Sequence, residues 1–418
     1  MDSQHAIYPI LFILCAMFVG AKVAGRLLER IGQPAIIGEL LVGVALGPSL
    51  LGWVVIPVGG DALQAAIADP ARAFVWQVFA ELGAIVLLFM VGLETGLRDL
   101  LRVGKAAFVV AVFGVVAPLA AGYALMRSLG HPTPEALFVG AAMVATSVGI
   151  TARVLSDLRA LQTAAARIIL GAAVIDDILG ILVLAVVVRM VAGTVSEPGA
   201  LTRAVGLLTL QVLLFTVLVT VVGTWLIRRY RDQVHRLPMR DAPFVLAIGL
   251  LLAVAGLAAW FGMAAIIGAF FAGIVIHDIS EEYELEARLK PLYEFLVPMF
   301  FVIMGAQVRV QQLADWSLLG VGLALAAVAI VTKLIPCALG AVGENWRTRA
   351  LVGVGMTPRG EVGIIVAAIA LTRGVIGPAL YGQVILMVLV TTLAAPPVLR
   401  WMLRRSPEPT ASVGALAN

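Results

Sequence analysis

Two adjacent acids, Asp176 and Asp177, lie inside the otherwise apolar stretch AAVIDDILGILVLAVVV at 172–188. An ionised carboxylate at the centre of a bilayer costs at least ~2.5 kcal/mol, so an acid placed there is neutral, paired or functional. On a helix the two side chains project about 100° apart, which lets both face one interior cavity. Neighbouring carboxylates also hinder each other's ionisation, so one of them can exchange a proton near neutral pH. We therefore predict that the pair binds protons or cations.

A basic residue that could pair with these acids lies far along the chain. Lys333, in AIVTKLIPCALG, is near the middle of another apolar stretch and too distant from its ends for the ammonium group to reach water easily. A lysine in that position must pair with an acid or lose its proton. We predict an aspartate–lysine pair between this residue and the acids of 172–188.

Residues that carry oxygen, together with Gly and Pro, interrupt two further apolar stretches, MVATSVGITARVL and GVGMTPRGEVGII. Backbone that leaves helical geometry at membrane depth is tolerated only where it is buried in protein or lines a cavity. The hydroxyls of Thr146 and Ser147, with the carbonyl groups freed nearby, suit a hard monovalent cation. We predict a Na⁺ site built from Asp176, Asp177, Thr146 and Ser147.

The second interruption also contains two charged residues, Arg359 and Glu361. Residues two apart on a helix lie on different faces, so these two side chains cannot readily pair with each other. We predict that each one balances a half-helix end or another interior charge. Their expected role is supporting electrostatics and not direct ligation of the ion.

The composition places these residues in a membrane protein. Of 418 residues, 61% are hydrophobic and 13% are charged, and the mean hydropathy is +1.05, well outside the range of soluble domains. Apolar runs of about 20 residues recur along the chain, the length at which an α-helix spans a bilayer. We predict an all-α polytopic membrane protein. We expect about thirteen transmembrane helices. They should lie over roughly 7–28, 34–51, 74–97, 105–127, 134–157, 163–190, 202–227, 242–260, 262–279, 291–308, 316–342, 347–373 and 377–403.

The order of these spans predicts their orientation and symmetry. Most Lys and Arg residues fall in the loops after odd-numbered spans, which predicts an outer N-terminus and a cytoplasmic C-terminus. Thirteen spans divide into inverted repeats of six, joined by a linker helix at 202–227. The interrupted spans 134–157 and 347–373 then occupy matching positions in the two repeats. Paired interrupted helices of this kind indicate a binding site near the membrane midplane.

Six stretches of the chain together resemble the monovalent cation:proton antiporter-2 family, and within it the NapA-type sodium/proton antiporters. In chain order they are GELLVGVALGPSLLG, LLFMVGLETGL, VATSVGITARVLSDL, VIDDILGI, VPMFFVIMG and MTPRGEVGIIVA. Each motif is short, and the match depends on their order and spacing over essentially the whole chain. The resemblance implies an antiporter fold of the NhaA/NapA type, with two discontinuous crossing helices.

The resemblance also implies a domain organisation along the chain. Family members are homodimers in which a core of helices carries the ion and moves elevator-fashion against the dimer domain. The corresponding segments here are the dimer domain at 1–97 and 241–310, the core at 98–190 and 311–405, a linker helix and loop at 191–240, and a disordered tail at 406–418.

Site residues follow from the same resemblance. It implies that Asp177 binds the transported ion and that Asp176 pairs with Lys333. It also implies that Thr146 and Ser147 provide the hydroxyls that the family carries on its unwound helix. Relatives with two aspartates exchange ions electrogenically, whereas electroneutral relatives carry Asn at the first position. The double aspartate of this chain therefore implies electrogenic exchange.

Together these features indicate a secondary transporter that exchanges Na⁺ or Li⁺ for H⁺, with proton and cation competing for Asp177. A K⁺/H⁺ antiporter of the same family is the alternative, because sites for the two ions differ in size and ligand field more than in residue type. A channel or a non-transporting sensor is disfavoured by the inverted halves. An enzyme is not expected, since the spans contain no His–Glu–His zinc pattern and no Ser–His pair.

The remaining expectations concern partners and surroundings. The partners are the cation, protons, the lipid bilayer of a bacterial-type inner (plasma) membrane and a second copy of the chain, with no cofactor. Nucleic acid is not expected, because the net charge of +4 is spread over loops. Cys15 and Cys337 lie in apolar runs and are predicted to be small buried hydrophobic residues.

Overall fold

Helices make up all the regular structure in the part of the chain that the computed structural model describes. The described residues are 3–54, 70–95, 97, 102–191, 206–207, 210–211, 214–234, 241–307 and 316–404. Among them, nine helical stretches are long and apolar enough to cross a membrane, and shorter apolar helices accompany them. The predicted all-helical, multi-pass class is confirmed. The predicted tail and much of the predicted linker segment lie outside the described residues.

The continuous helices follow the predicted apolar runs. The long ones are α1 (Ser3–Arg30), α4 (Pro70–Glu94), α6 (Gly104–Ser128), α9 (Ala164–Val191), α12 (Ala242–Trp260), α14 (Leu285–Ala306), α15 (Trp316–Gly340) and α18 (Pro378–Arg404). The shorter ones are α2 (Ala35–Leu46), α13 (Ala265–Ser280) and α11 (Gly223–Val234), which continues the π-helical turn η1 (Leu218–Val222). The predicted span at 34–51 was too long, because Pro48 follows α2 and proline does not continue a helix.

Both stretches predicted to be interrupted are broken helices. The first consists of α7 (Thr133–Val144) and α8 (Val148–Asp157), and the second of α16 (Trp346–Gly355) and α17 (Glu361–Thr372). A backbone hydrogen bond of 2.9 Å from the Ser147 N–H to the Pro358 carbonyl joins the two breaks. Backbone N–H and carbonyl groups that the first break leaves without helical partners therefore find some of their hydrogen-bond partners in the second break.

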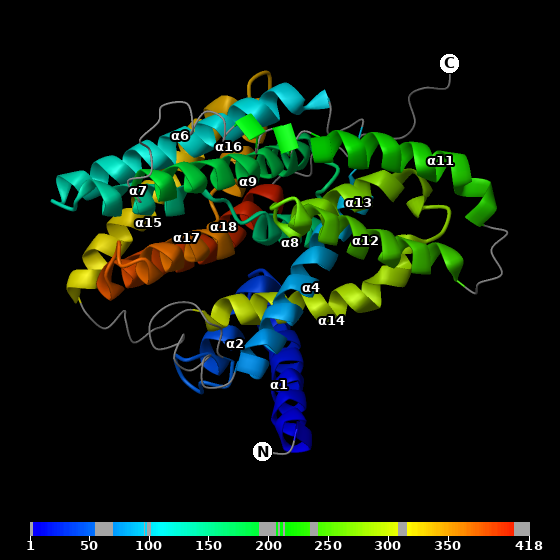
Figure 1. Cartoon of the computed structure of the whole chain (residues 1–418), viewed down its shortest axis with the longest axis horizontal. Helices are drawn as coiled ribbons and strands as arrows, with labels where there is room; N and C mark the ends of the chain where they lie inside the picture. Colours follow the sequence, from blue (N-terminus) through cyan, green and yellow to red (C-terminus); the bar gives the residue numbers. More distant parts are fainter. Residues whose placement is uncertain are drawn as a thin grey trace.

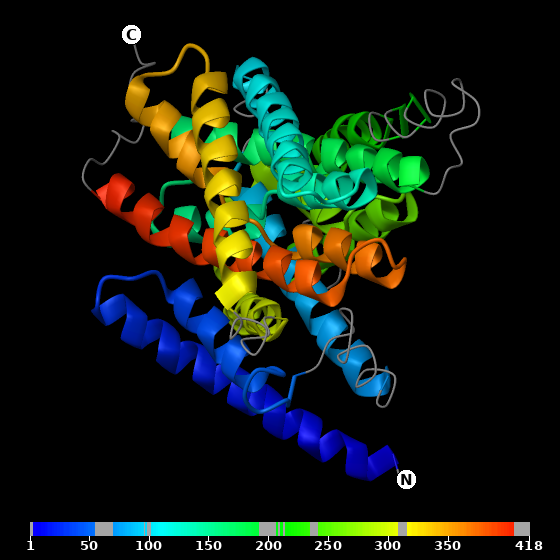
Figure 2. The ribbon, with the colours of Figure 1, turned by 90° about the vertical axis from the view of Figure 1, so that its left-hand side faces the viewer.

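The helices form two sets by their packing. The panel set consists of α1, α2, α4, α12, α13 and α14, and the core set of α6, α7, α8, α9, α15, α16, α17 and α18. Figure 1 shows α11, α12 and α13 on one side of the molecule and α6, α7, α15 and α17 on the other. Figure 2 shows α1 and α2, in blue, as a layer beneath α18, in red. Within the core set, α8 is the helix that packs against both α4 and α2 of the panel set.

Glycines let the panel helices approach backbone to backbone. A Cβ on Gly43 of α2 would collide with the Val302 carbonyl of α14, and a Cβ on Gly305 of α14 would collide with the Leu40 carbonyl of α2. Small residues at membrane helix interfaces permit this close packing, which provides van der Waals contact where lipid offers no hydrophobic drive. The panel set is therefore held together by reciprocal glycine contacts.

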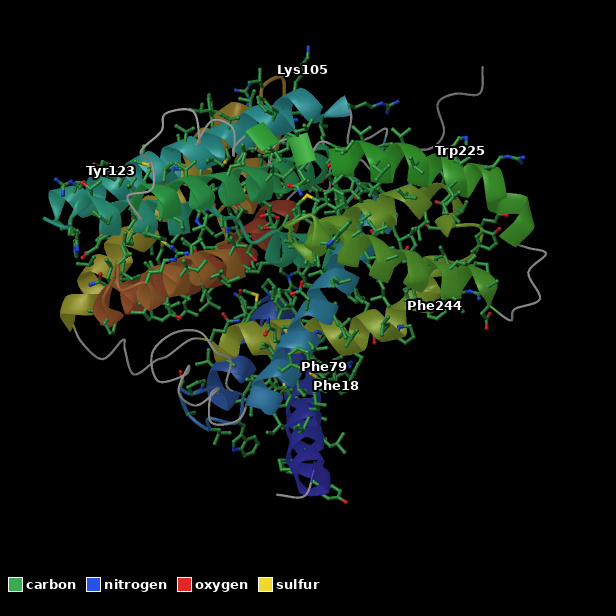
Figure 3. The ribbon with its side chains drawn as sticks, viewed as in Figure 1. Phe18, Phe79, Lys105, Tyr123, Trp225 and Phe244 are labelled. Carbon is green, nitrogen blue, oxygen red and sulfur yellow. The ribbon has the colours of Figure 1, made fainter. Side chains whose placement is uncertain are left out.

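Aromatic rings complete the contact between α1, α4 and α14. The ring of Phe295 lies 5.5 Å from that of Phe18 and 6.4 Å from that of Phe79, measured between centroids. Figure 3 shows Phe18 and Phe79 next to each other in the lower part of the molecule. Such tilted and edge-on pairs are favourable aromatic geometries. They fix the long helix α1 to the rest of the panel set.

Candidate functional site

The centre of the candidate site is an ion pair between α9 and α15. Nζ of Lys333 lies 2.8 Å from Oδ1 of Asp176, and neither side chain has any exposed surface. The other carboxylate oxygen, Oδ2, accepts a hydrogen bond of 3.1 Å from the backbone N–H of Thr146 in the first break. An acid and an ammonium group buried this deeply stabilise each other's charged forms, because neither has water available. The structure thus brings together three of the predicted site residues.

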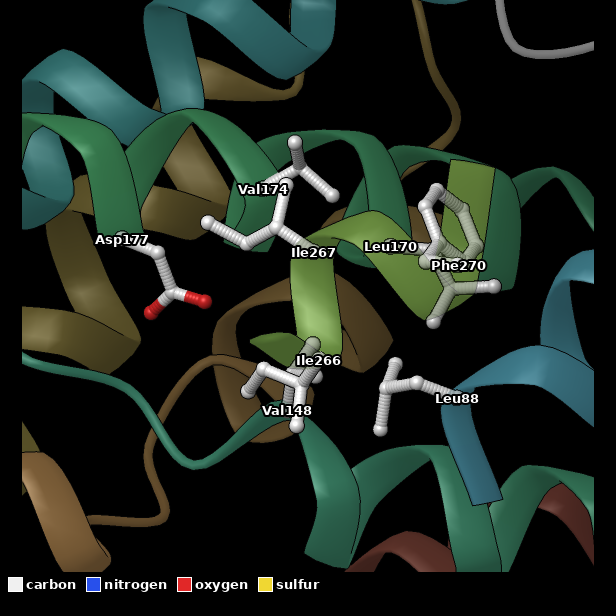
Figure 4. Close-up of a pocket in the computed structure, with 8 residues that line it drawn as sticks. All are labelled: Leu88, Val148, Leu170, Val174, Asp177, Ile266, Ile267 and Phe270. Atoms are coloured by element: carbon white, nitrogen blue, oxygen red, sulfur yellow. The ribbon is translucent and has the colours of Figure 1, made fainter. Parts of the chain in front are cut away.

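Asp177 has different surroundings from its neighbour. Its carboxylate lines a small pocket whose other walls are apolar, and Figure 4 shows the carboxylate directed toward the unwound chain beside Val148. The pocket is lined by Leu88, Val148, Leu170, Val174, Asp177, Ile266, Ile267 and Phe270. These residues come from α4 and α13 of the panel set and α8 and α9 of the core set. The two acids, expected to face one cavity, therefore differ: only Asp177 lines this pocket, at the boundary between the sets.

Thr146 and Ser147 occupy the first break, as predicted. Both are buried, and the hydroxyl oxygen of Thr146 has no hydrogen-bond partner among the described residues. A buried polar atom without a partner is unfavourable, unless an ion or water completes its coordination. Ser147 packs closely against Gly360 of the second break. A Cβ added to Gly360 would lie 2.5 Å from the Oγ of Ser147. A side chain at position 360 would displace this serine.

Arg359 reaches from the second break to the end of the first half-helix. Its guanidinium donates to the carbonyl oxygens of Ala145 and Val144, at 3.4 and 3.5 Å, and to that of Ala329 at 3.2 Å. The Val144 and Ala145 carbonyls lie at the C-terminus of α7 and carry partial negative charge, so a cation is favourable there. Glu361 begins α17, but its side chain lies outside the described part of the structure.

Sequence reasoning missed one contact that connects the two broken helices. The Thr151 hydroxyl donates a hydrogen bond of 2.6 Å to the Gly355 carbonyl, the last of α16. Arg359 and Thr151 therefore each bind the C-terminal end of a half-helix that belongs to the other broken helix. The sequence does place a hydroxyl, that of Thr151, one helical turn after the first break. Its partner could not be predicted, because it lies 204 positions away in the chain.

The two cysteines also differ from each other. Cys337 is buried, as predicted, with its Sγ 3.6 Å from the Val110 carbonyl oxygen. Cys15 is exposed, so the prediction of burial was wrong for that residue. It lies on α1, which is long and apolar enough to cross a membrane, so an apolar sequence context there does not require burial within the protein.

Comparison with known proteins agrees with this architecture. Residues 13–405 match the model of the family described as sodium/hydrogen exchanger, transmembrane. The chain belongs to this family. Its members are secondary transporters and not enzymes, so the recognition of a monovalent cation:proton antiporter family and the exclusion of enzyme activity are both confirmed.

Individual exchanger relatives cover nearly the whole chain. It is 36% identical to the high-affinity Na⁺/H⁺ antiporter NhaS3 of Synechocystis, over 94% of this chain and 89% of that protein. It is 30% identical to the Na⁺/H⁺-K⁺ antiporter GerN of Bacillus cereus, over 94% and 96%. The solved sodium proton antiporter MjNhaP1 of Methanocaldococcus jannaschii has the same fold, with a TM-score of 0.64 and 18% identity over 96% and 97% of the two chains.

Proposed function

We propose that this exchanger moves Na⁺ or Li⁺ against H⁺ across a bacterial-type inner membrane, with both ions competing for Asp177. The observation that carries the proposal is the position of this carboxylate. It opens to a pocket between the two helix sets, while its neighbour Asp176 is closed off against Lys333. The names of the relatives NhaS3 and GerN support sodium as the cation.

The chemistry of the site follows from its donors. Asp177 supplies the negative charge, and the unpartnered hydroxyl of Thr146 supplies a neutral oxygen, a combination that suits a monovalent cation. A proton on the Asp177 carboxylate removes that charge and with it the attraction for the cation. Competition between the ions then requires no cofactor.

The buried ion pair supports electrogenic exchange. When a cation reaches the site, its positive charge competes with the Lys333 ammonium for Asp176. Once released from the acid, a lysine with no exposed surface gives up its proton readily. Two protons then cross for each cation, which moves net charge across the membrane.

Alternating access is proposed to be an elevator movement of the core set against the panel set. Two features support it: both breaks lie in the core set, and the panel set is tightly packed through glycines. We further propose two inverted repeats of six helices about a linker helix, an outer N-terminus, a cytoplasmic C-terminus and a homodimer formed through the panel set. The matched placement of the breaks and the loop charges support this arrangement.

The proposal is tested with purified protein in liposomes that contain a pH-sensitive dye. Proton flux is measured as Na⁺, Li⁺ and K⁺ are titrated separately, with Asp177→Asn as the inactive control. Saturable flux with Na⁺ or Li⁺, absent with K⁺ and in the control, is expected. Flux driven by K⁺ alone would contradict the proposal and favour the K⁺/H⁺ alternative. The name of the relative GerN, a Na⁺/H⁺-K⁺ antiporter, includes potassium.

A further inference from the structure

A buried ionic cluster joins the two helix sets away from the ion site. Its centre is Arg153 on α8 of the core set, with Nε 3.1 Å from Oδ1 of Asp157 on the same helix. Nη2 of Arg153 lies 3.8 Å from Oε1 of Glu39, which belongs to α2 of the panel set. The side chains of Arg153 and Glu39 are only 10% and 3% exposed. The ion pair therefore crosses the boundary between the sets in a region with little water.

A third helix completes the cluster around the arginine. The guanidinium of Arg153 lies 5.0 Å from the ring centroid of Tyr293, on α14 of the panel set. A guanidinium over an aromatic face gains cation–π attraction, especially where it is desolvated. One core-set side chain thus makes an ionic and an aromatic contact with two different panel helices.

A second polar contact crosses the same boundary at the same end of the molecule. Arg400 on α18 donates a hydrogen bond to the backbone carbonyl of Gln33, in the turn between α1 and α2. Figure 2 shows this end of α18, in red, above the blue turn. Asp157 and Arg400 also line one pocket with Glu29 of α1 and Pro34 of the same turn. The polar residues at this end of the boundary form a polar band that consists of Glu29, Gln33, Glu39, Arg153, Asp157 and Arg400.

The band also contains polar atoms that the present arrangement leaves without partners. In the described part of the chain, Oε2 of Glu39, the side-chain oxygen of Gln33 and Nε of Arg400 are buried and make no hydrogen bond. Within a fixed interface such atoms are unfavourable. At a boundary where one body slides past another, they are available as partners for a second arrangement.

We propose that Arg153 is a positioning residue for transport: it holds the core set against the panel set in the arrangement seen here, and it must release Glu39 when the core moves. This inference rests on the proposed elevator movement. It adds a specific contact whose strength sets how long the protein stays in this arrangement. Asp157 keeps the guanidinium oriented in both arrangements, because it moves with the same helix.

Hydrogen–deuterium exchange on the full-length protein in nanodiscs tests this role. Glu39→Gln keeps the shape of the side chain and removes its charge. We expect backbone exchange in 35–46 and 148–157 to rise about tenfold, because losing one partner of a buried charge pair favours opening of the boundary. The turnover rate of Na⁺-driven proton flux should change in the same variant, because the pair sets how long the protein stays in this arrangement. A general loss of structure would instead also raise exchange in helices that do not pack against the panel set, such as 316–340.

A matched control comes from an ion pair inside the panel set. Glu294 of α14 lies 4.0 Å from Lys22 of α1, and both side chains are about half exposed. Glu294→Gln removes the same charge from the same set without touching the boundary, so exchange in 35–46 and 148–157 should stay at the parent rate. Arg153→Lys, which keeps the charge but loses the forked geometry, should raise exchange in the same segments less than Glu39→Gln.

Two outcomes would overturn the inference. One is an unchanged exchange rate in both Glu39→Gln and Arg153→Lys. The other is an equal rise in Glu294→Gln, which would show that any lost charge has this effect. Repeating the exchange measurement in Asp177→Asn separates the inference from the proposed function. The effect of Glu39→Gln should persist in that background, whereas residual transport by Asp177→Asn alone would contradict only the ion-site assignment.

Discussion

The interiors of the two helix sets differ in what fills them. Where α2 meets α14, and where α4 meets α13, glycine lets backbone touch backbone, with no side chain between the helices. At the centre of the core set, two helices are broken, and the space holds the charged pair of Asp176 and Lys333 with Arg359 beside it. The glycine-packed helices resist any shift relative to each other, because backbone atoms in direct contact cannot move aside as side chains can. The centre of the core set contains buried charge and, on Thr146, a hydroxyl oxygen without a hydrogen-bond partner among the described residues.

The largest expected effect is at the polar centre. Asp177→Asn should abolish cation-driven proton flux, because an amide neither binds a proton in this range nor attracts a cation by charge. The measurement is dye-reported flux in liposomes with protein of verified insertion. Asp241→Asn is the matched control, since that acid is exposed and pairs with Arg288 at 2.7 Å; it should transport normally. Sodium-dependent flux retained by Asp177→Asn would remove the carrier role from this residue.

The next largest effect is expected in the panel set. Gly43→Ala places a methyl group on the Val302 carbonyl of α14, and the two helices must separate to admit it. Overpacking of this kind costs about 1–3 kcal/mol, so the melting temperature in detergent should fall clearly. Gly256→Ala on α12 is the control, because a Cβ there meets nothing within 4 Å. Equal melting temperatures for Gly43→Ala and the parent would show that the glycine contact is not tight.

A third prediction separates charge movement from transport. Lys333→Gln should lose the sustained transport current measured on a solid-supported membrane, because the proposed second proton leaves from this lysine. Lys22→Gln, a lysine 41% exposed in the panel set, should keep the parent current. An unchanged current amplitude and charge stoichiometry in Lys333→Gln would exclude the two-proton scheme and leave the role of Asp177 intact.

The smallest effect is expected at the contact between the half-helices. Thr151→Val removes the hydroxyl that binds the Gly355 carbonyl. Hydrogen bonds between membrane helices contribute about 0.6 kcal/mol on average and at most about 1.7 kcal/mol, so the melting temperature should fall slightly. Thr151→Ser keeps the donor and should recover most of the loss. A melting temperature of Thr151→Val equal to that of the parent would show that the hydrogen bond contributes nothing measurable, and an equal fall in Thr151→Ser would show that the methyl group matters as much as the hydroxyl.

Sequence reasoning located the elements better than their partners. Hydropathy placed the helices, because a bilayer requires about 20 apolar residues for each span. Pro358 and Gly360 placed the second break, since proline interrupts the helical hydrogen bonds and glycine allows the close approach to Ser147. The length of α2 was misjudged, because apolar residues continue beyond Pro48 although the helix does not.

What the sequence by itself determined is a polytopic helical protein with acids, a lysine and broken helices at membrane depth. These features are local, because the cost of burying charge or open backbone applies to a residue wherever its neighbours are. The sequence predicted that Lys333 pairs with one of these acids, and only the family resemblance pointed to Asp176, 157 positions away. The tertiary structure alone decided that Asp177 lines a pocket at the boundary between the sets. It also decided that Arg153 meets Glu39 across that boundary. Contacts of this kind depend on the packing of whole helices, for which a single sequence carries no local signal.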